Sequence, residues 1–262
     1  MAPRLRLPDW SYGAIGAVGL IAALELVTRI ELIPSRHFPP PTETLETLAG
    51  ELDGASLWSD VGSTLEGWAI GLGLAFAVGV PLGIAVGSNA LLYRSLRFPI
   101  EFLRPVPSVA LIPLVVLILG TQLDSKIFLV FFASVWPLLI QTIYGMQDAD
   151  PIARDTARAF QLRRAERLVA VTLPGAVPYI ATGLRISSSV ALILAVTAEL
   201  VIGMDGLGRS ISLAGDGGAV ELMYALIAVT GMVGWALNSV FSRAERRVLH
   251  WHPSTRPVEA LE

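Results

Sequence analysis

Cysteine is absent from the chain, lysine occurs once, at Lys126, and histidine occurs three times. Without cysteine there is no disulfide framework, no thiolate metal site and no cysteine nucleophile, and the redox compartment stays undetermined. His37, His250 and His252 lie outside the long apolar runs, so an intramembrane enzyme would have no embedded histidine base. We therefore expect no catalytic residue, no metal site and no enzymatic activity in this chain.

Charge is also scarce, since 16% of the 262 residues are charged, 53% are hydrophobic and the mean hydropathy is +0.63. A soluble domain of this length is normally less apolar. We infer that the chain is surrounded by membrane lipid, and we expect no nucleic-acid partner.

Several segments approach the roughly 20 mainly apolar residues that a spanning helix needs. They are Tyr12–Ile30, Leu65–Val86, Phe98–Leu119, Ile127–Tyr144, Val177–Ile202 and Met223–Val240. The predicted fold class is all-α, a polytopic membrane protein with about six transmembrane helices. The third segment contains Glu101, Arg104, Pro105, Pro107 and Pro113, so it should be broken or sheltered by protein.

The chain is expected to have three parts. Residues 1–60 hold the first transmembrane helix and a periplasmic interfacial segment, residues 61–250 the transmembrane core, and residues 251–262 a cytoplasmic tail. A signal peptide could also produce the first apolar run, but no convincing cleavage site follows it, so a retained helix is expected. Leucines at helical spacing among acids predict a short interfacial helix over Thr42–Leu52.

The positive residues between the apolar segments predict the orientation, because cytoplasmic loops are enriched in arginine and lysine. With the N-terminus inside, the cytoplasmic segments hold Arg4, Arg6, Arg94, Arg97, Arg154, Arg158, Arg163, Arg164, Arg167, Arg243, Arg246, Arg247 and Arg256. The opposite face holds Arg29, Arg36, Lys126 and Arg209. Both termini are therefore expected in the cytoplasm.

Small residues recur at every fourth position of the second span, at Gly67, Gly71, Ala75, Gly79 and Gly83. Such a row lets two helix backbones approach closely and gain dispersion contacts in lipid. Packing inside one subunit is favoured over a subunit interface.

The long connection Gln147–Thr172 predicts an arginine-rich helical hairpin. Asp150 before Pro151 is a helix-start pattern, since the carboxylate accepts free amide hydrogens and proline fits the first helical position. Pro174 is expected to end this element and Pro178 to help start the next span. An amphipathic hairpin of this kind could simply lie on anionic headgroups.

The same hairpin resembles a known family. Asp155-Thr156-Ala157, then Gln161, then Val171-Thr172-Leu173-Pro174 are similar, in residue type and spacing, to the E-A-A, three residues, G, nine residues, I-x-L-P signature of bacterial ABC-importer permeases. In that family the loop forms a cytoplasmic coupling helix that docks on an ATPase subunit. The resemblance implies that the coupling residues are Asp155, Thr156, Ala157, Arg158, Phe160, Gln161, Leu173 and Pro174. The family has glutamate at position 155 and glycine at position 161, and a glutamine is less comfortable than glycine at positive φ.

Further motifs extend the resemblance to the nitrate, sulfonate and taurine importer permeases, over roughly Ser63 to Trp251. They include Leu103-Arg104-Pro105-Val106-Pro107-Ser108, Ser125-Lys126-Ile127-Phe128 and Gly206-Leu207-Gly208. The resemblance implies a homodimer in the bacterial inner membrane with two ATPase subunits and a periplasmic or lipid-anchored substrate-binding protein. It favours a small anion, such as a sulfonate, taurine, nitrate or a related organic solute, as substrate.

The energy for transport must come from a partner. A phosphate-binding loop needs G-x-x-x-x-G-K-S/T, and Lys126 lacks that glycine framework. We therefore expect no cofactor in this chain, with ATP and Mg bound by the partner ATPase.

Polar residues inside the spans are candidates for the translocation path, because they normally face a bundle interior or an aqueous cavity. The candidates are Arg104, Arg185, Ser188, Thr197 and Glu199. Arg185 and Glu199 could equally form structural pairs near the membrane boundaries, and the hydroxyls could bond back to helix carbonyls. The glycine-rich stretch Gly203–Gly218 is either a gate or an ordinary flexible loop with a short helix.

An ion-coupled secondary transporter is the alternative function. Such a carrier normally shows repeated halves with interrupted helices and carboxylates near the middle of the membrane. No internal repeat is visible, and Glu25, Glu66, Glu101 and Glu199 lie nearer the ends of the predicted spans.

Overall fold

The computed structural model describes residues 9–34, 36–148 and 150–249, and over these ranges the chain is helical with no strand. The long helices are α1 (Asp9–Arg29), α3 (Ala55–Ser88), α6 (Leu123–Gln147), α9 (Leu173–Ile202) and α11 (Val220–Val248). The shorter elements are α2 (Pro41–Glu51), α4 (Ala90–Leu103), η1 (Ser108–Leu111), α5 (Ile112–Leu119), α7 (Pro151–Ala159), α8 (Arg164–Arg167), η2 (Leu168–Thr172) and α10 (Leu207–Asp216). The predictions for Arg4, Arg6, His250, His252, Arg256 and the tail 251–262 lie outside the described residues.

The predicted membrane fold is confirmed. Five helical segments of the described chain are long and apolar enough to cross a membrane. A sixth crossing is obtained if α4 and the segment Ser108–Leu119 are counted as one span, bent by 79°. Pro105 and Pro107 lie at this bend, where neither can donate a helical hydrogen bond. The third predicted span is therefore broken, as its prolines indicated.

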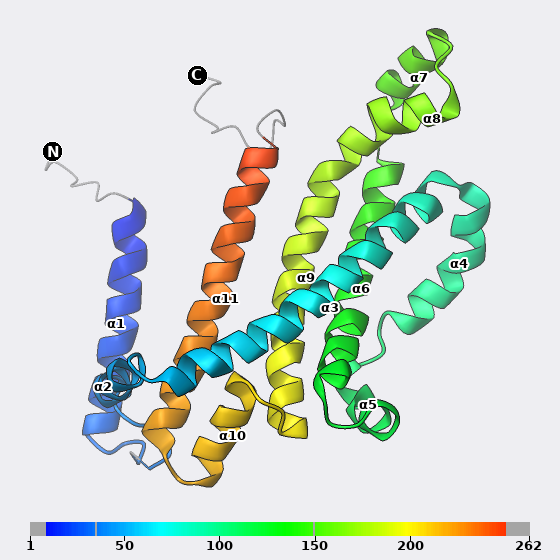
Figure 1. The fold of residues 1–262 in the computed structure, drawn as a ribbon. Helices are drawn as coiled ribbons and strands as arrows, with labels where there is room; N and C mark the ends of the chain where they lie inside the picture. Colours follow the sequence, from blue (N-terminus) through cyan, green and yellow to red (C-terminus); the bar gives the residue numbers. More distant parts are fainter. Residues whose placement is uncertain (1–8, 35, 149, 250–262) are drawn as a thin grey trace, which may run out of the picture.

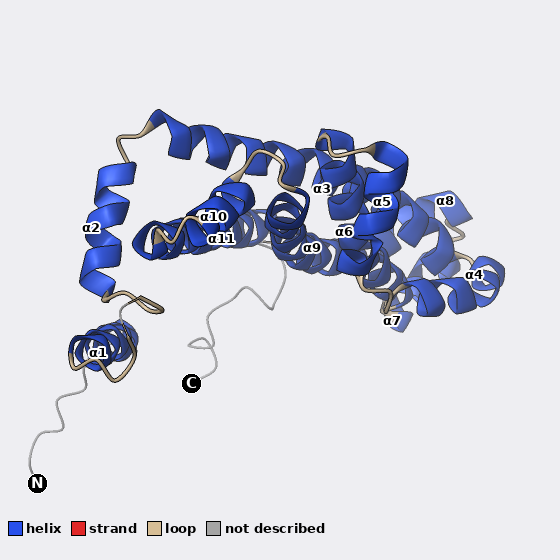
Figure 2. Cartoon of the chain, turned by 90° about the horizontal axis from the view of Figure 1, so that it is seen from below, coloured by secondary structure: helices blue, strands red, loops and turns tan. Residues whose placement is uncertain are grey.

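The long helices α3, α6 and α9 form the centre of the molecule, with α3 running obliquely across the other two (Figure 1). Residues 150–172, here called the hairpin, project from one end, which also holds the start of α1 and the end of α11 (Figure 1). The opposite end holds α2, α5 and α10. Seen along the helices, α1 stands apart and reaches the rest through α2 (Figure 2).

The row of small residues on α3 packs against α6 within the chain, which confirms the favoured interpretation. A Cβ atom added at Gly71 would lie 2.5 Å from Cγ1 of Val130, and one added at Gly83 would lie 2.6 Å from Cβ of Thr142. Both distances are far shorter than a normal carbon–carbon contact. The backbones of α3 and α6 can therefore approach this closely only because glycine has no side chain at these positions.

Gly71 and Gly73 provide a matched pair for testing this packing, because nothing lies within 4 Å of a Cβ added at Gly73. Gly71→Ala is expected to lower the free energy of unfolding by about 1–3 kcal/mol through overpacking. Gly73→Ala should leave it unchanged or raise it by up to about 1 kcal/mol, since alanine favours helix over glycine. Thermal unfolding of the purified protein in detergent, followed by tryptophan fluorescence, measures both; equal losses would contradict the assignment.

One prediction about a helix boundary is wrong. Pro174 does not end the hairpin, and Pro178 lies inside α9, which begins at Leu173 and continues from α8 through the π-helical turn η2. Pro174 occupies the first turn of α9. A wide π-turn directly before it relaxes the α-helical pairing that the missing amide hydrogen of proline would otherwise break.

Candidate functional site

The hairpin begins as its sequence indicates. A side-chain oxygen of Asp150 accepts a hydrogen bond of 2.8 Å from the amide of Ile152, and Pro151 is the first residue of α7. The predicted helix start is confirmed. Ala157 is buried at 4% exposure, so this face of α7 packs inward.

The turn after α7 holds Gln161 in a conformation that suits glycine best. Gln161 has φ of +58°, its amide donates to the carbonyl of Arg158 (2.9 Å), and the amide of Leu162 donates to the carbonyl of Ala157 (3.1 Å). This is a Schellman motif, in which the residue after the C-cap adopts the left-handed conformation. A glutamine there costs roughly 1–2 kcal/mol more than glycine, so the turn forms without the residue that suits it best.

The tip of the hairpin, formed by Ile152, Asp155, Thr156, Arg158, Phe160 and Gln161, presents apolar and charged side chains together. Ile152 is 77% exposed and Phe160 is 78% exposed. Arg158 and Asp155 form an exposed ion pair of 2.9 Å between Nη1 and Oδ1. Thr156 and Gln161 are exposed beside them. An exposed aromatic side chain surrounded by polar groups is typical of a protein-binding surface.

Leu173 and Pro174, the other two predicted coupling residues, lie in the first turn of α9 at the base of the hairpin. The structure therefore brings six of the eight predicted coupling residues to one tip, Ala157 with its side chain turned inward, and places two at the base.

The predicted path residues do not share one site within a single chain. Arg104 lines a cavity of about 390 Å³ with Ser108, Trp136 and Gln141. Ser188 and Thr197 line a different cavity, of about 440 Å³, on another face of α9.

The remaining two path candidates form ion pairs. Arg185 pairs with Glu245 of α11 (3.1 Å), and Glu199 pairs with Lys126 of α6 (2.8 Å). Thr197 bonds back to the carbonyl of Ile193 (2.7 Å), as a helical hydroxyl often does. Their role in a path stays a prediction.

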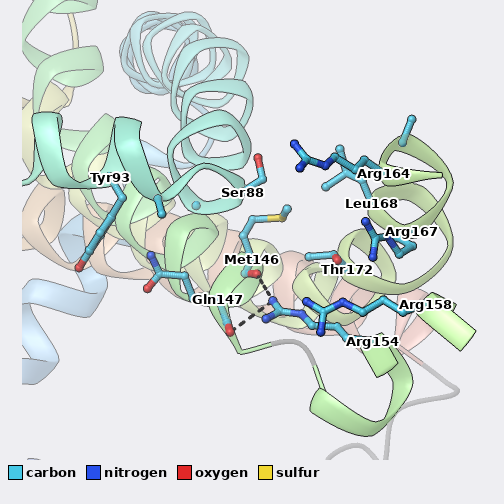
Figure 3. A pocket seen from close by; sticks show the side chains of 13 residues that line it. Ser88, Tyr93, Met146, Gln147, Arg154, Arg158, Arg164, Arg167, Leu168 and Thr172 are labelled. Carbon is cyan, nitrogen blue, oxygen red and sulfur yellow. Dashed lines mark hydrogen bonds between the residues drawn. The ribbon is translucent and has the colours of Figure 1, made fainter. Parts of the chain in front are cut away.

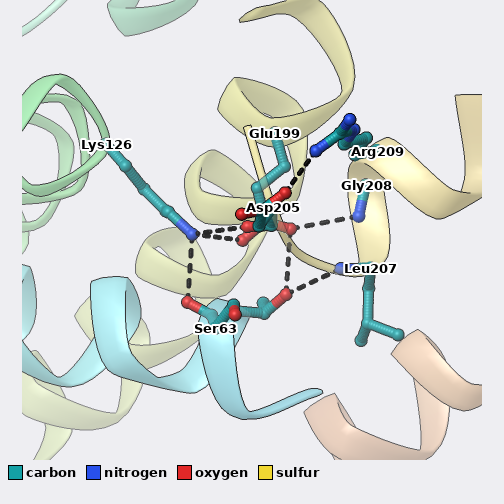
Figure 4. A network of polar contacts seen from close by, with 8 residues as sticks. Ser63, Lys126, Glu199, Asp205, Leu207, Gly208 and Arg209 are labelled. Atoms are coloured by element: carbon teal, nitrogen blue, oxygen red, sulfur yellow. Dashed lines mark hydrogen bonds and ion pairs between the residues drawn. The ribbon is translucent and has the colours of Figure 1, made fainter. Parts of the chain in front are cut away.

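The Lys126–Glu199 pair is the feature that sequence reasoning missed, because Lys126 was counted as a charge of an exposed connection. The Lys126 side chain is 3% exposed and the Glu199 side chain is 0% exposed. The ammonium of Lys126 also donates to the carbonyls of Ser63 (3.0 Å) and Asp205 (3.1 Å), which uses all three hydrogens (Figure 4). The pair thus joins α3, α6, α9 and the segment before α10.

The second carboxylate oxygen of Glu199 is satisfied too. It accepts hydrogen bonds from the hydroxyl of Thr64 (2.9 Å) and from the amide of Gly208 (3.0 Å), and the Thr64 hydroxyl accepts one from the amide of Leu207 (3.0 Å). A buried ion pair is tolerated when such additional bonds satisfy its remaining atoms. The network therefore fixes how the helices meet at the end opposite the hairpin.

Gly206 and Gly208 are required by this network. Gly206 has φ of +144°, and a Cβ there would lie 2.2 Å from Cδ of Glu199; at Gly208 it would lie 2.2 Å from the carbonyl oxygen of Val196. The glycine-rich stretch Gly203–Gly218 is mostly the helix α10, Leu207–Asp216, longer than the short helix expected there. Its two early glycines serve close packing, and a gating role stays a prediction.

Comparison with known proteins gives a consistent result. Residues 79–249 match the family described as "Binding-protein-dependent transport system inner membrane component". The taurine transport system permease protein TauC of Escherichia coli (strain K12) is 33% identical over 245 residues, which cover 90% of this chain and 89% of that protein. The nitrate import permease protein NrtB of Leptolyngbya laminosa is 31% identical over 193 residues, 74% of this chain and 69% of that protein.

A solved structure of the MetNI methionine ABC transporter, in inward-facing conformations, has a similar fold. The TM-score is 0.65 at 19% sequence identity, with 74% of this chain and 96% of that chain covered. At this identity the likeness concerns the fold alone.

Proposed function

The chain belongs to the family of binding-protein-dependent transport system inner membrane components, and from this premise we propose that it carries a small oxyanion or sulfonate across the membrane while partner ATPases act on its hairpin. It is a transmembrane permease subunit of an ATP-driven importer. The observation that carries the proposal is the family match over residues 79–249, which includes the whole exposed hairpin.

The distribution of arginine supports a cytoplasmic hairpin end in the bacterial inner membrane. That end carries Arg94, Arg97, Arg154, Arg158, Arg163, Arg164, Arg167, Arg243, Arg246 and Arg247, whereas Arg29, Arg36 and Arg209 lie toward the other end. Cytoplasmic segments are enriched in such residues. Both ends of the chain are accordingly proposed to lie in the cytoplasm.

The hairpin tip is proposed to dock on an ATPase subunit that binds ATP and Mg, because the chain has no phosphate-binding loop of its own. Phe160 would supply the apolar anchor and Arg158 the polar rim of this contact. Closure of two ATPases would then draw two hairpins together and rock the helices between inward-facing and outward-facing states.

A second copy of the chain and a substrate-binding protein complete the proposed importer. The Arg104 cavity and the Ser188–Thr197 cavity are separate within one chain, and a second subunit is proposed to complete the path. The binding protein, periplasmic or lipid-anchored, would deliver substrate at the end that holds α10. A small anion suits the charge of Arg104 and is the chemistry shared by taurine's sulfonate and nitrate, the substrates that the names of the relatives print.

Uptake by the reconstituted importer tests this proposal. The chain is placed in proteoliposomes with a candidate ATPase and a candidate binding protein from the same organism, and uptake of radiolabelled taurine, other sulfonates and nitrate is measured with internal ATP or with a non-hydrolysable analogue. We expect uptake of at least one of these anions only with ATP and binding protein. Uptake driven by a proton or sodium gradient without ATP would instead establish the ion-coupled carrier.

A further inference from the structure

Four arginines surround one opening at the hairpin end. Arg154, Arg158, Arg164 and Arg167 line a cavity of about 650 Å³ between the hairpin, the end of α3 and the start of α4. Figure 3 shows their side chains reaching toward this space from α7 and α8. No acidic residue lines the cavity, as far as the described residues show.

Two of the four guanidinium groups already have partners. Arg154 donates to the carbonyl of Met146 (2.9 Å) at the C-terminal end of α6, where a cation offsets the helix dipole. Arg158 pairs with Asp155. These contacts account for Arg154 and Arg158 without any ligand.

Arg164 and Arg167 are different. Within residues 9–34, 36–148 and 150–249, neither side chain forms an ion pair or a hydrogen bond. The nearby Glu166 does not line the cavity. Its carboxylate instead accepts a hydrogen bond from the backbone amide of Arg163 (2.7 Å). Guanidinium groups held around one opening repel each other, and an oxyanion between them would remove that cost and accept forked hydrogen bonds.

From this arrangement we propose that the cavity binds a phosphate-bearing anion through Arg164 and Arg167, with the hydroxyl of Thr172 as a neutral donor. The cavity shares no lining residue with the Arg104 cavity. Arg158 lines it and also belongs to the hairpin tip, but Arg164 and Arg167 lie outside the tip, so the proposed site goes beyond the transport path and the coupling contact.

The position of the cavity allows two sources for that phosphate. Ala90 lines it, and the next residue, Leu91, is 74% exposed at the start of the amphipathic α4, so the headgroup of a neighbouring lipid can reach the opening. The cavity also opens at the hairpin end, which is proposed to face the cytoplasm, so soluble phosphate can enter it. The shared chemistry is a negatively charged tetrahedral phosphate group, which suits clustered arginines.

The test compares lipid and soluble anion on one set of variants. The full-length protein, with any subunits that it retains, is placed in nanodiscs of phosphatidylcholine with or without phosphatidylglycerol, and bound lipid is counted by native mass spectrometry. Inorganic phosphate is titrated separately by calorimetry. The variants are Arg164→Gln/Arg167→Gln, the charge-conserving Arg164→Lys/Arg167→Lys, and the matched control Arg163→Gln, whose side chain does not line the cavity.

We expect at least one probe to bind, and the double glutamine variant to weaken it by about tenfold or more, since charge-assisted bonds are lost. The lysine variant should lie between that variant and the wild type, and Arg163→Gln should match the wild type. Retention of phosphatidylglycerol alone identifies a lipid, and phosphate binding alone a soluble ligand. Equal loss in Arg163→Gln, no binding of either probe, or loss of only the associated ATPase would overturn the proposal; the last would mean that acidic side chains of the ATPase fill the cavity.

Discussion

Lys126→Met is expected to lower the free energy of unfolding by about 3–5 kcal/mol, because it leaves the Glu199 carboxylate buried without its counter-charge. The carbonyls of Ser63 and Asp205 lose their donor at the same time. Unfolding of the detergent-solubilised protein by increasing sodium dodecyl sulfate, followed by tryptophan fluorescence, measures the loss.

The ion pair of Arg209 and Asp205 is the matched control, since it lies next to the buried pair but its side chains are 46% and 78% exposed. Arg209→Ala should change stability by less than about 1 kcal/mol, as exposed pairs usually do. The double variant Lys126→Met/Glu199→Gln removes both charges and keeps an acceptor for Thr64 and Gly208. It should be more stable than Lys126→Met, with a coupling energy of about 1–3 kcal/mol. Additive losses, or an equal effect of Arg209→Ala, would show that the pair does not hold the helices together.

The sequence predicts the spans well because apolar length is a local property. One exception is the hairpin's junction with α9. A proline such as Pro174 normally ends a helix, but the π-turn at Leu168–Thr172 lets the helix continue into α9. The local sequence pattern does not predict that π-turn. The start of α3 at Ala55 instead of Leu65 has a similar origin, since its first turns are stabilised by packing on α10 and α11 rather than by apolar composition.

The hairpin and the buried pair differ in how far they can be predicted. The N-cap of α7 at Asp150 depends on neighbours within a few residues, so the local sequence located it, and the family signature pointed to the turn at Gln161. Lys126 and Glu199 are 73 positions apart, and each has an ordinary local context. One sequence signal could have found the pair. An unpaired Glu199 carboxylate in an apolar run is costly and favours a nearby cation, and this chain has one lysine, Lys126.

Phe160→Asp is expected to abolish coupling while leaving the permease folded. The ring is 78% exposed, so its loss should change stability by no more than about 0.5 kcal/mol. If the hairpin docks on the ATPase as proposed, an aromatic anchor contributes about 2 kcal/mol or more, and the complex should weaken by about thirtyfold or more. ATP-dependent uptake in proteoliposomes and the ATPase retained on the purified permease measure both consequences.

Val248→Asp is the control for this experiment, because Val248 is 49% exposed at the same end of the molecule but lies outside the hairpin. It places the same charge at the same end of the molecule without altering the tip, so uptake should stay close to the wild-type rate. Normal membrane yield and thermal unfolding of both variants exclude misfolding. Since the proposal makes the exposed Phe160 the anchor of the ATPase contact, wild-type uptake by Phe160→Asp would contradict docking of the ATPase on the hairpin tip.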